Sequence, residues 1–213
     1  MITPDNNITL YHGSKSGITG RITPCSRRRC DFGQGFYMGT GSEQPLTLIC
    51  NYPGAKLYTL RVHHPDSLRI LDLKADLGWA LLVAYNRGRM DSAVGTALYR
   101  RISELSAGYD MIFGYIANDR MFVVLDRFFN GDITDQALIH SLCALKPGKQ
   151  YAAITQKACD CVEILQVRHL TSEDRSVLKR ESEANRASGI ALADEICRQY
   201  RREGRYFDEI ITD

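Results

Sequence analysis

Two stretches decide the fold: Ile8-Thr9-Leu10-Tyr11-His12-Gly13-Ser14 and Asp31-Phe32-Gly33-Gln34-Gly35-Phe36-Tyr37-Met38. From Ile8 to Tyr11 the first stretch is typical of a short strand. Glycine and polar residues begin at His12 and continue to about Gly35, after which a second short strand is expected. We therefore expect His12, Gly13 and Ser14 to lie at the end of a strand.

Further elements are expected on the C-terminal side of these two strands. The periodicity of apolar residues separates stretches of strand from stretches of helix. Strands are expected over residues 57–62, 68–73, 111–113, 150–154 and 162–167, and helices over residues 43–50, within 75–106 on either side of Gly88, and on either side of the turn Asn130-Gly131-Asp132. A tight loop, Lys146-Pro147-Gly148-Lys149, precedes residue 150. No repeat and no long Pro/Ser/Gly linker interrupts this region, so residues 1–167 are expected to form one domain.

The C-terminal segment has a different composition. From Thr171 to about Arg202 it is strongly charged and has helical spacing. Leu192, Ile196 and Tyr200 form an apolar stripe at i, i+4 spacing, which is expected to dock on another surface. Residues 168–213 are therefore expected to be a helical C-terminal extension.

Composition limits the class of protein. The 213 residues have ordinary globular proportions, with 44% hydrophobic and 24% charged residues. No run approaches the roughly 20 apolar residues of a membrane span, and the N-terminus lacks the pattern of a signal peptide. We expect a cytoplasmic protein without a membrane partner, although delivery as an effector stays open. Cys159 and Cys161 lack the spacing of a structural zinc site, so no metal is expected.

A resemblance gives the two opening stretches a function. His12-Gly13-Ser14, followed by Phe32-Gly33-Gln34-Gly35-Phe36-Tyr37, resembles the paired motifs of ADP-ribosyltransferases of the poly(ADP-ribose) polymerase and diphtheria-toxin type. The chain also resembles the bacterial domain-of-unknown-function family 3990, over roughly residues 8–166. The resemblance implies an α+β fold: a split antiparallel β-sheet with surrounding helices, an NAD⁺ cleft between its halves and a helical C-terminal appendage.

The chemistry of NAD⁺ gives each motif residue an expected role. A glycine at position 13 lets the backbone approach the carboxamide, because no Cβ intervenes. His12 is expected to donate a hydrogen bond to a ribose hydroxyl. The ring of Tyr37 is expected to stack on the pyridinium, a contact worth roughly 0.5–2 kcal/mol.

Other residues complete the expected NAD⁺ site. Ser14, Gly33, Gly35 and Phe36 are expected to contact the ligand, although serine and glycine at such positions also simply make turns. Arg28 belongs to the basic cluster of residues 27–29, which is either a solvated loop or a contact to the pyrophosphate. The net charge of +2 is too small to indicate a nucleic-acid partner.

The third motif position departs from the family pattern. The resemblance places Gln150 where the family usually has a catalytic glutamate. A neutral amide keeps hydrogen bonding but offers only dipolar stabilisation and is a poor general base. Either the acceptor is already nucleophilic, or a carboxylate such as Glu163 or Asp160 supplies the missing charge. Elongation to poly(ADP-ribose) is not expected.

The function implied by the resemblance is therefore mono-ADP-ribosylation. NAD⁺ would be the substrate and an unidentified macromolecule, protein or nucleic acid, the acceptor, as in a bacterial toxin or effector. Two alternatives stay open: an NAD⁺ glycohydrolase, and a non-catalytic module that binds NAD⁺ or a protein. The charged C-terminal helices offer a surface to a neutralising partner protein, or they cover the sheet.

Overall fold

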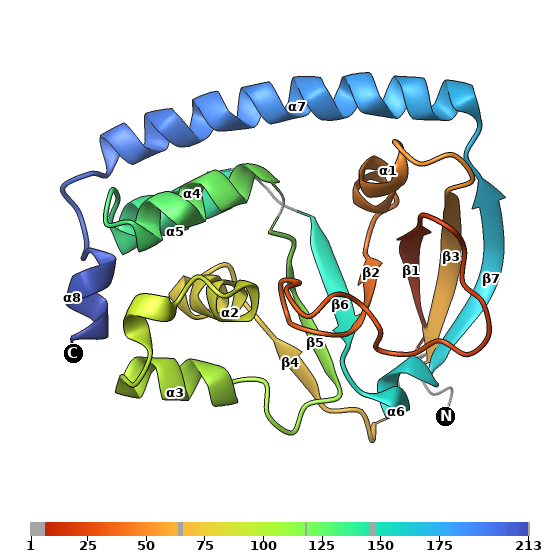
Figure 1. The fold of residues 1–213 in the computed structure, drawn as a ribbon, viewed down its shortest axis with the longest axis horizontal. Helices are drawn as coiled ribbons and strands as arrows, with labels where there is room; N and C mark the ends of the chain where they lie inside the picture. The colour runs from red at the N-terminus through yellow and green to blue at the C-terminus, as the bar shows by residue number, and fades with distance from the viewer. Residues whose placement is uncertain (1–6, 64–65, 118, 145–147, 213) are drawn as a thin grey trace, which may run out of the picture.

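A computed structural model describes residues 7–63, 66–117, 119–144 and 148–212. Its centre is a seven-stranded sheet of order β4-β5-β6-β2-β1-β3-β7 (Figure 1). The strands are β1 (Asn7–Ser14), β2 (Phe36–Gly39), β3 (Lys56–His63), β4 (Ile70–Asp72), β5 (Met111–Tyr115), β6 (Lys149–Ala153) and β7 (Val162–His169). All neighbours are antiparallel except β4 and β5, which are parallel. The predicted α+β class is confirmed.

Helices surround the sheet, and several begin or end at residues that the sequence makes recognisable. They are α1 (Glu43–Ile49), α2 (Leu77–Arg87), the 3₁₀ turn η1 (Asp91–Ala93), α3 (Ala97–Glu104), α4 (Asp119–Phe129), α5 (Asp135–Ala144), α6 (Gln156–Cys159), α7 (Ser172–Gln199) and α8 (Phe207–Ile211). The Asp76 carboxylate caps α2 by accepting from the Trp79 N–H, and Gly88 ends this helix in the left-handed conformation. Two helices separated at Gly88 agree with the prediction. Lys146 and Pro147 of the predicted tight loop lie outside the described residues.

The sheet is nearly divided between β1 and β2. All of β1 pairs with β3, from Asn7↔His63 to Ser14↔Lys56. In contrast, β1 and β2 share one paired position, Tyr11↔Gly39. The sheet therefore has two parts, β4-β5-β6-β2 and β1-β3-β7, which separate beyond this pair. His12, Gly13 and Ser14 are the last three residues of β1, which confirms that they lie at a strand end, and pairing with β3 extends the strand past Tyr11 through Ser14.

The two faces of the sheet are covered differently. On one face the largest apolar cluster joins β5 and β6 to the helices α2, α3, α4 and α5. On the other face a second cluster contains Leu10, Phe36 and Met38, covered by the segment between β1 and β2 through Ile22 and by α6. The segment between β1 and β2 is thus part of the core, which restrains the residues that lead into β2.

The C-terminal helices belong to the same core. Figure 1 shows α7 running across both parts of the molecule, and it packs on α1, α4 and α5. Ala193 and Cys197 of α7, and Phe207 and Ile210 of α8, are buried in the largest cluster. Of the predicted stripe, Ile196 is buried and Tyr200 packs against the cluster, whereas Leu192 is 41% exposed and Ala193 is buried instead.

Candidate functional site

The expected site lies where β1 and β2 separate. The His12 Nδ1 atom is 2.7 Å from the Tyr37 carbonyl oxygen. The imidazole also stacks on the ring of Phe36, with ring centroids 4.4 Å apart and an interplanar angle of 25°. Phe36 and Tyr37 are neighbours in a regular strand, so their side chains point to opposite faces. His12 therefore shares a face with Phe36 and meets Tyr37 through its backbone.

The protonation state of His12 follows from these contacts. Burial lowers the pKa of His12 below its ordinary value of 6.5, and the hydrogen bond to the Tyr37 backbone raises it by less. A carbonyl oxygen can only accept a hydrogen bond, so the neutral ring carries its proton on Nδ1 and donates to Tyr37. The Nε2 atom is then a hydrogen-bond acceptor. The donor expected to contact the ribose is thus engaged within the protein, and the ring offers a ligand an acceptor instead.

Tyr37 holds the end of the segment that leads into its own strand. Its hydroxyl donates to the Gly33 carbonyl oxygen at 2.7 Å and accepts from the Phe32 N–H at 2.9 Å. Burial raises the pKa of Tyr37, and the neighbouring Asp31 carboxylate raises it further, so the phenol stays protonated. The rings of Tyr37 and Phe32 stack with centroids 6.4 Å apart. Gly33 has a φ of 79°, which favours glycine in this turn.

Gln150 belongs to a buried polar cluster. Its Nε2 atom donates to Oδ2 of Asp31 at 2.8 Å, and both side chains are buried. The same Asp31 oxygen accepts from the Ala117 N–H at 3.0 Å. The other oxygen accepts from Arg87, whose Nε lies 3.0 Å away and whose Nη2 forms an ion pair with it. One carboxylate therefore joins β6, α2 and the residue Ala117 that follows β5.

This cluster determines the orientation of the Gln150 amide. Because a carboxylate only accepts, the amide must turn its NH₂ group toward Asp31. The hydrogen bond of this side chain to Asp31 uses the amide nitrogen, so Oε1 is the remaining acceptor of the side chain. Sequence analysis missed Asp31 and Arg87 as parts of the site. An aspartate next to a glycine-rich motif is the one visible signal, and its partners lie 56 and 119 positions away.

The remaining small residues of the motif also have contacts within the protein. A Cβ on Gly13 would lie 2.6 Å from the Pro45 carbonyl oxygen, so glycine at this position lets α1 approach β1. The Ser14 hydroxyl accepts from the Gly17 N–H at 2.9 Å. A Cβ on Gly35 would lie 3.1 Å from the Ala153 carbonyl oxygen. Each residue thus supports the local packing, and contact with NAD⁺ remains a prediction for all three.

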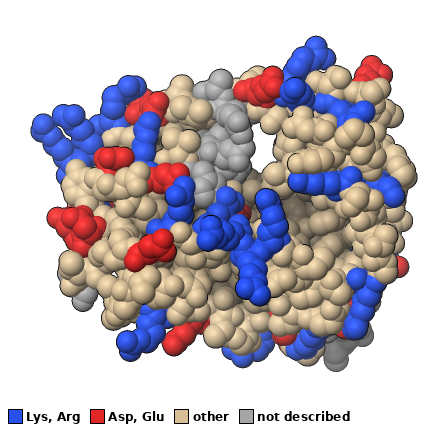
Figure 2. Space-filling view, viewed as in Figure 1, with Lys and Arg blue, Asp and Glu red and all other residues tan. Residues whose placement is uncertain are grey.

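The basic cluster of residues 27–29 is exposed, and Arg28 with it. The loop that carries it is closed at its base, since the Ser26 N–H donates to the Gly35 carbonyl oxygen at 3.1 Å. Figure 2 shows Lys and Arg side chains gathered near the middle of this face, over the segment between β1 and β2 in Figure 1. Beside them the surface is hollowed (Figure 2). Its exposure leaves Arg28 accessible to an anionic ligand.

The two carboxylates considered as substitutes for a catalytic glutamate are engaged elsewhere. Asp160 accepts two hydrogen bonds from Arg21, at 2.9 and 2.6 Å. Glu163, on the edge strand β7, lies 3.3 Å from both Arg61 and His63. Both acids are exposed at the surface. The carboxylate in contact with Gln150 is Asp31, which corrects the expectation for Asp160 and Glu163.

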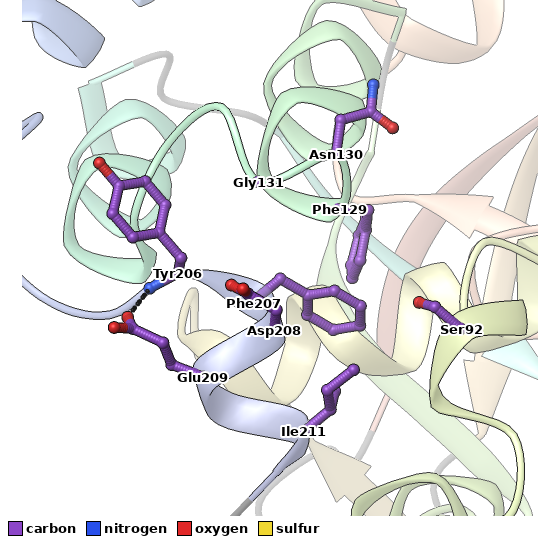
Figure 3. Close-up of a pocket in the computed structure, with 9 residues that line it drawn as sticks. All are labelled: Ser92, Phe129, Asn130, Gly131, Tyr206, Phe207, Asp208, Glu209 and Ile211. Atoms are coloured by element: carbon purple, nitrogen blue, oxygen red, sulfur yellow. Dashed lines mark hydrogen bonds between the residues drawn. The ribbon is translucent and has the colours of Figure 1, made fainter.

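A separate surface pocket lies away from the predicted site. It has a volume of about 530 Å³ and lies between α8, the turn after α4 and Ser92 (Figure 3). Phe129 and Phe207 form its apolar part, and Glu209 at its rim caps α8 by accepting from the Tyr206 N–H at 2.7 Å. No residue of the predicted NAD⁺ site lines it. Its lining includes the carboxylates of Asp208 and Glu209.

Comparisons with known proteins place the chain in a family. No curated protein matches the sequence. Among solved structures, the M. tuberculosis MbcT–MbcA toxin–antitoxin complex matches with a TM-score of 0.42 and 10% identity, over 82% of this chain and 90% of that chain. In the described part of the chain no helix is long and apolar enough to cross a membrane. The family model described as "Protein of unknown function (DUF3990)" matches residues 8–164, more than half of the sequence, and the chain therefore belongs to that family.

Proposed function

We propose that this protein cleaves NAD⁺ at the bond between nicotinamide and ribose and transfers ADP-ribose to a macromolecular acceptor, protein or nucleic acid. The observation that carries the proposal is the contact of 2.7 Å between His12 Nδ1 and the Tyr37 carbonyl oxygen, at the point where β1 and β2 separate. Strands that separate leave backbone polar groups that need partners. A ligand bound between them would supply those partners.

The reaction defines what the site must provide. The bond between the ribose C1′ and the nicotinamide nitrogen breaks, and its electron pair leaves with the nicotinamide. The acceptor then forms a bond to C1′ and releases a proton. Positive charge develops on the ribose, so groups that orient the sugar and present oxygen or nitrogen lone pairs favour the reaction.

His12 is suited to hold the ribose in this reaction. Its lowered pKa keeps the ring neutral near neutral pH, so it adds no positive charge beside a ligand that is already cationic. With the proton on Nδ1, the Nε2 atom can accept a hydrogen bond from a ribose hydroxyl. Stacking on Phe36 and the bond to Tyr37 fix the ring, which lowers the entropic cost of orienting the sugar.

Gln150 is proposed to act through its carbonyl oxygen. Asp31 holds the amide nitrogen, so the oxygen is the atom left to face positive charge or to accept from a hydroxyl. An amide dipole stabilises charge less than a carboxylate does, which fits transfer to an acceptor that is already nucleophilic. Tyr37 is proposed to shape the pocket by fixing residues 32 and 33, and Arg28 to contact the pyrophosphate.

The experiment is to measure nicotinamide release from NAD⁺ by the purified protein, with and without cell lysate. We expect release that requires lysate and attaches labelled ADP-ribose to a macromolecule. His12→Ala should abolish release while leaving the protein folded. His63→Ala is the matched control, because His63 is an exposed histidine at the end of β3, and it should retain full activity. Full turnover in His12→Ala would refute the proposed site.

The other outcomes distinguish the alternatives. Release without lysate, yielding free ADP-ribose, would indicate an NAD⁺ glycohydrolase. Binding of NAD⁺ without release would indicate a non-catalytic module. Arg28→Ala should raise the KM for NAD⁺ several-fold and leave kcat nearly unchanged, since a contact to the pyrophosphate holds substrate and transition state alike. An unchanged KM would remove Arg28 from the site.

A further inference from the structure

The outer edge of the sheet carries an exposed apolar strand. β7 (Val162–His169) is the last strand of the sheet order, and β3 is its one hydrogen-bonded neighbour among the described strands. Three large apolar side chains of this strand are exposed to solvent. Ile164, Leu165 and Val167 are 40%, 42% and 43% exposed. A long edge strand with exposed apolar side chains is a template for pairing with another strand. We call this strand, residues 162–169, the β7 edge.

An irregularity in β7 places its side chains in an unusual pattern. Ile164 pairs with Leu60 and Val167 with Tyr58, and a register shift leaves Leu165 between them without a partner residue. Leu60 and Tyr58 are two positions apart in β3, so Ile164 and Val167 share one face of the sheet. In a regular strand two residues three positions apart would point to opposite faces.

The same register shift places two charged residues of β7 on one face of the sheet. Glu163 pairs with Arg61 and Arg168 with Leu57. Arg61 and Leu57 are four positions apart in β3, so Glu163 and Arg168 share the face opposite to Ile164 and Val167. The β7 edge thus has an apolar pair on one face and an oppositely charged pair on the other.

From this pattern we propose that the β7 edge pairs antiparallel with the β7 edge of a second copy of this chain. A twofold axis between Leu165 and Gln166 would place Ile164 opposite Val167 of the second copy and Glu163 opposite Arg168 of the second copy. The twofold axis generates each of these pairs twice, and the two residues of a pair lie on the same face of the joined sheet. Apolar and oppositely charged cross-strand pairs stabilise a sheet, whereas like charges directly opposite destabilise it.

The existing contacts of the charged residues allow this pairing. Glu163 lies 3.3 Å from Arg61, and Arg168 lies 2.6 Å from Asp174. All four partners are solvent-accessible, and exposed ion pairs contribute little to stability. In Figure 1, α7 begins beyond the end of β7 and runs away from this strand, past α1 toward α4 and α5. The proposal is independent of NAD⁺ chemistry.

The first test measures mass against concentration by light scattering or sedimentation. The wild-type chain should approach twice its 24.0 kDa mass as its concentration rises to about 1 mM, where even a millimolar Kd is detectable. A monomer throughout that range would overturn the proposal.

Charge reversal identifies the interface. Glu163→Arg leaves two arginines on the β7 edge and Arg168→Glu leaves two glutamates, so each variant alone should be monomeric. An equimolar mixture of the two should form heterodimers, because every arginine then faces a glutamate. Glu181→Arg, at an exposed position of α7, is the matched control and should dimerise like the wild type. Circular dichroism of each variant checks folding.

The mixture makes the test specific to the second copy. Restored pairing cannot come from contacts within one chain, since each variant keeps its own altered contacts to Arg61 or Asp174. Homodimers of either variant as stable as the wild-type dimer would show that the β7 edge is not the interface. Failure of two folded variants to associate when mixed would refute the proposed register.

Discussion

The Gln150 amide nitrogen lies 2.8 Å from an Asp31 carboxylate oxygen, although 119 positions separate the two residues. This contact makes residue 150 part of a buried cluster in which the negative charge belongs to residue 31. A carboxylate at position 150 would face a second carboxylate. The amide and the aspartate therefore form a matched pair.

The first prediction concerns exchange of these two groups. From the sequence alone, Gln150→Glu would supply the negative charge of a catalytic glutamate. In the folded protein, the same substitution places two carboxylates at hydrogen-bond distance, because residue 150 contacts Asp31. We expect a loss of about 2–4 kcal/mol in the free energy of unfolding near neutral pH and no gain in nicotinamide release. Adding Asp31→Asn should recover only part of the stability, because the asparagine NH₂ group can donate to the new glutamate but can no longer accept from the Ala117 N–H.

The pH dependence of Gln150→Glu provides a second readout in urea denaturation. Two carboxylates that share a proton have one raised pKa, so the folded state holds a proton that the unfolded state releases. The stability of this variant should fall as pH rises above the ordinary carboxyl range. A variant as stable as the wild type at all pH values would mean that residues 31 and 150 are not in contact.

The second prediction concerns His12. Its pKa in the folded state is lowered. Below pH 6.5 the unfolded state therefore binds a proton that the folded state does not bind until the pH is lower. The free energy of unfolding should therefore fall as pH decreases from 6.5 toward the lowered pKa. His12→Gln should flatten this dependence, and His63→Gln, which changes an exposed histidine, should leave it intact. Identical pH profiles for the wild type and His12→Gln would contradict the assignment.

The third prediction compares two glycines. Gly13→Ala should lower the free energy of unfolding by about 1–3 kcal/mol, because its Cβ would lie 2.6 Å from the Pro45 carbonyl oxygen and α1 would have to move. Gly41→Ala is the control, since a Cβ there would meet no atom within 4 Å. Thermal denaturation of both variants measures the difference. Equal effects would mean that α1 is not packed closely on β1.

The fourth prediction concerns the C-terminal segment. Phe207 is buried, and its ring centroid lies 5.5 Å from that of Phe128 and 4.8 Å from that of Phe129. Phe207→Ala should cost about 3–5 kcal/mol in the free energy of unfolding. Val94→Ala, at a side chain that is 60% exposed, should change it by no more than about 0.5 kcal/mol. A small effect at Phe207 would indicate that α8 contributes little to the core.

Local patterns predicted most of the elements but not all of their ends. The helix of residues 43–49 and the two helices around the Asn130-Gly131-Asp132 turn follow from periodicity and turn residues, which act over a few positions. The extension of β1 through Ser14 was missed because β3, and not the residues of β1, stabilises it. The five-residue helix α8 was missed because it is too short for a periodic pattern and depends on burial of Phe207 and Ile210.

The sequence by itself determined the α+β class, the family and the candidate residues His12, Tyr37 and Gln150, because these depend on short motifs and their order. The tertiary structure alone decided what those residues can do. It assigned the His12 proton to Nδ1 through a carbonyl of another strand, and it placed Asp31 against Gln150. Hydrogen-bond roles and pKa values depend on neighbours in space, and those neighbours lie 25 and 119 positions away along the chain.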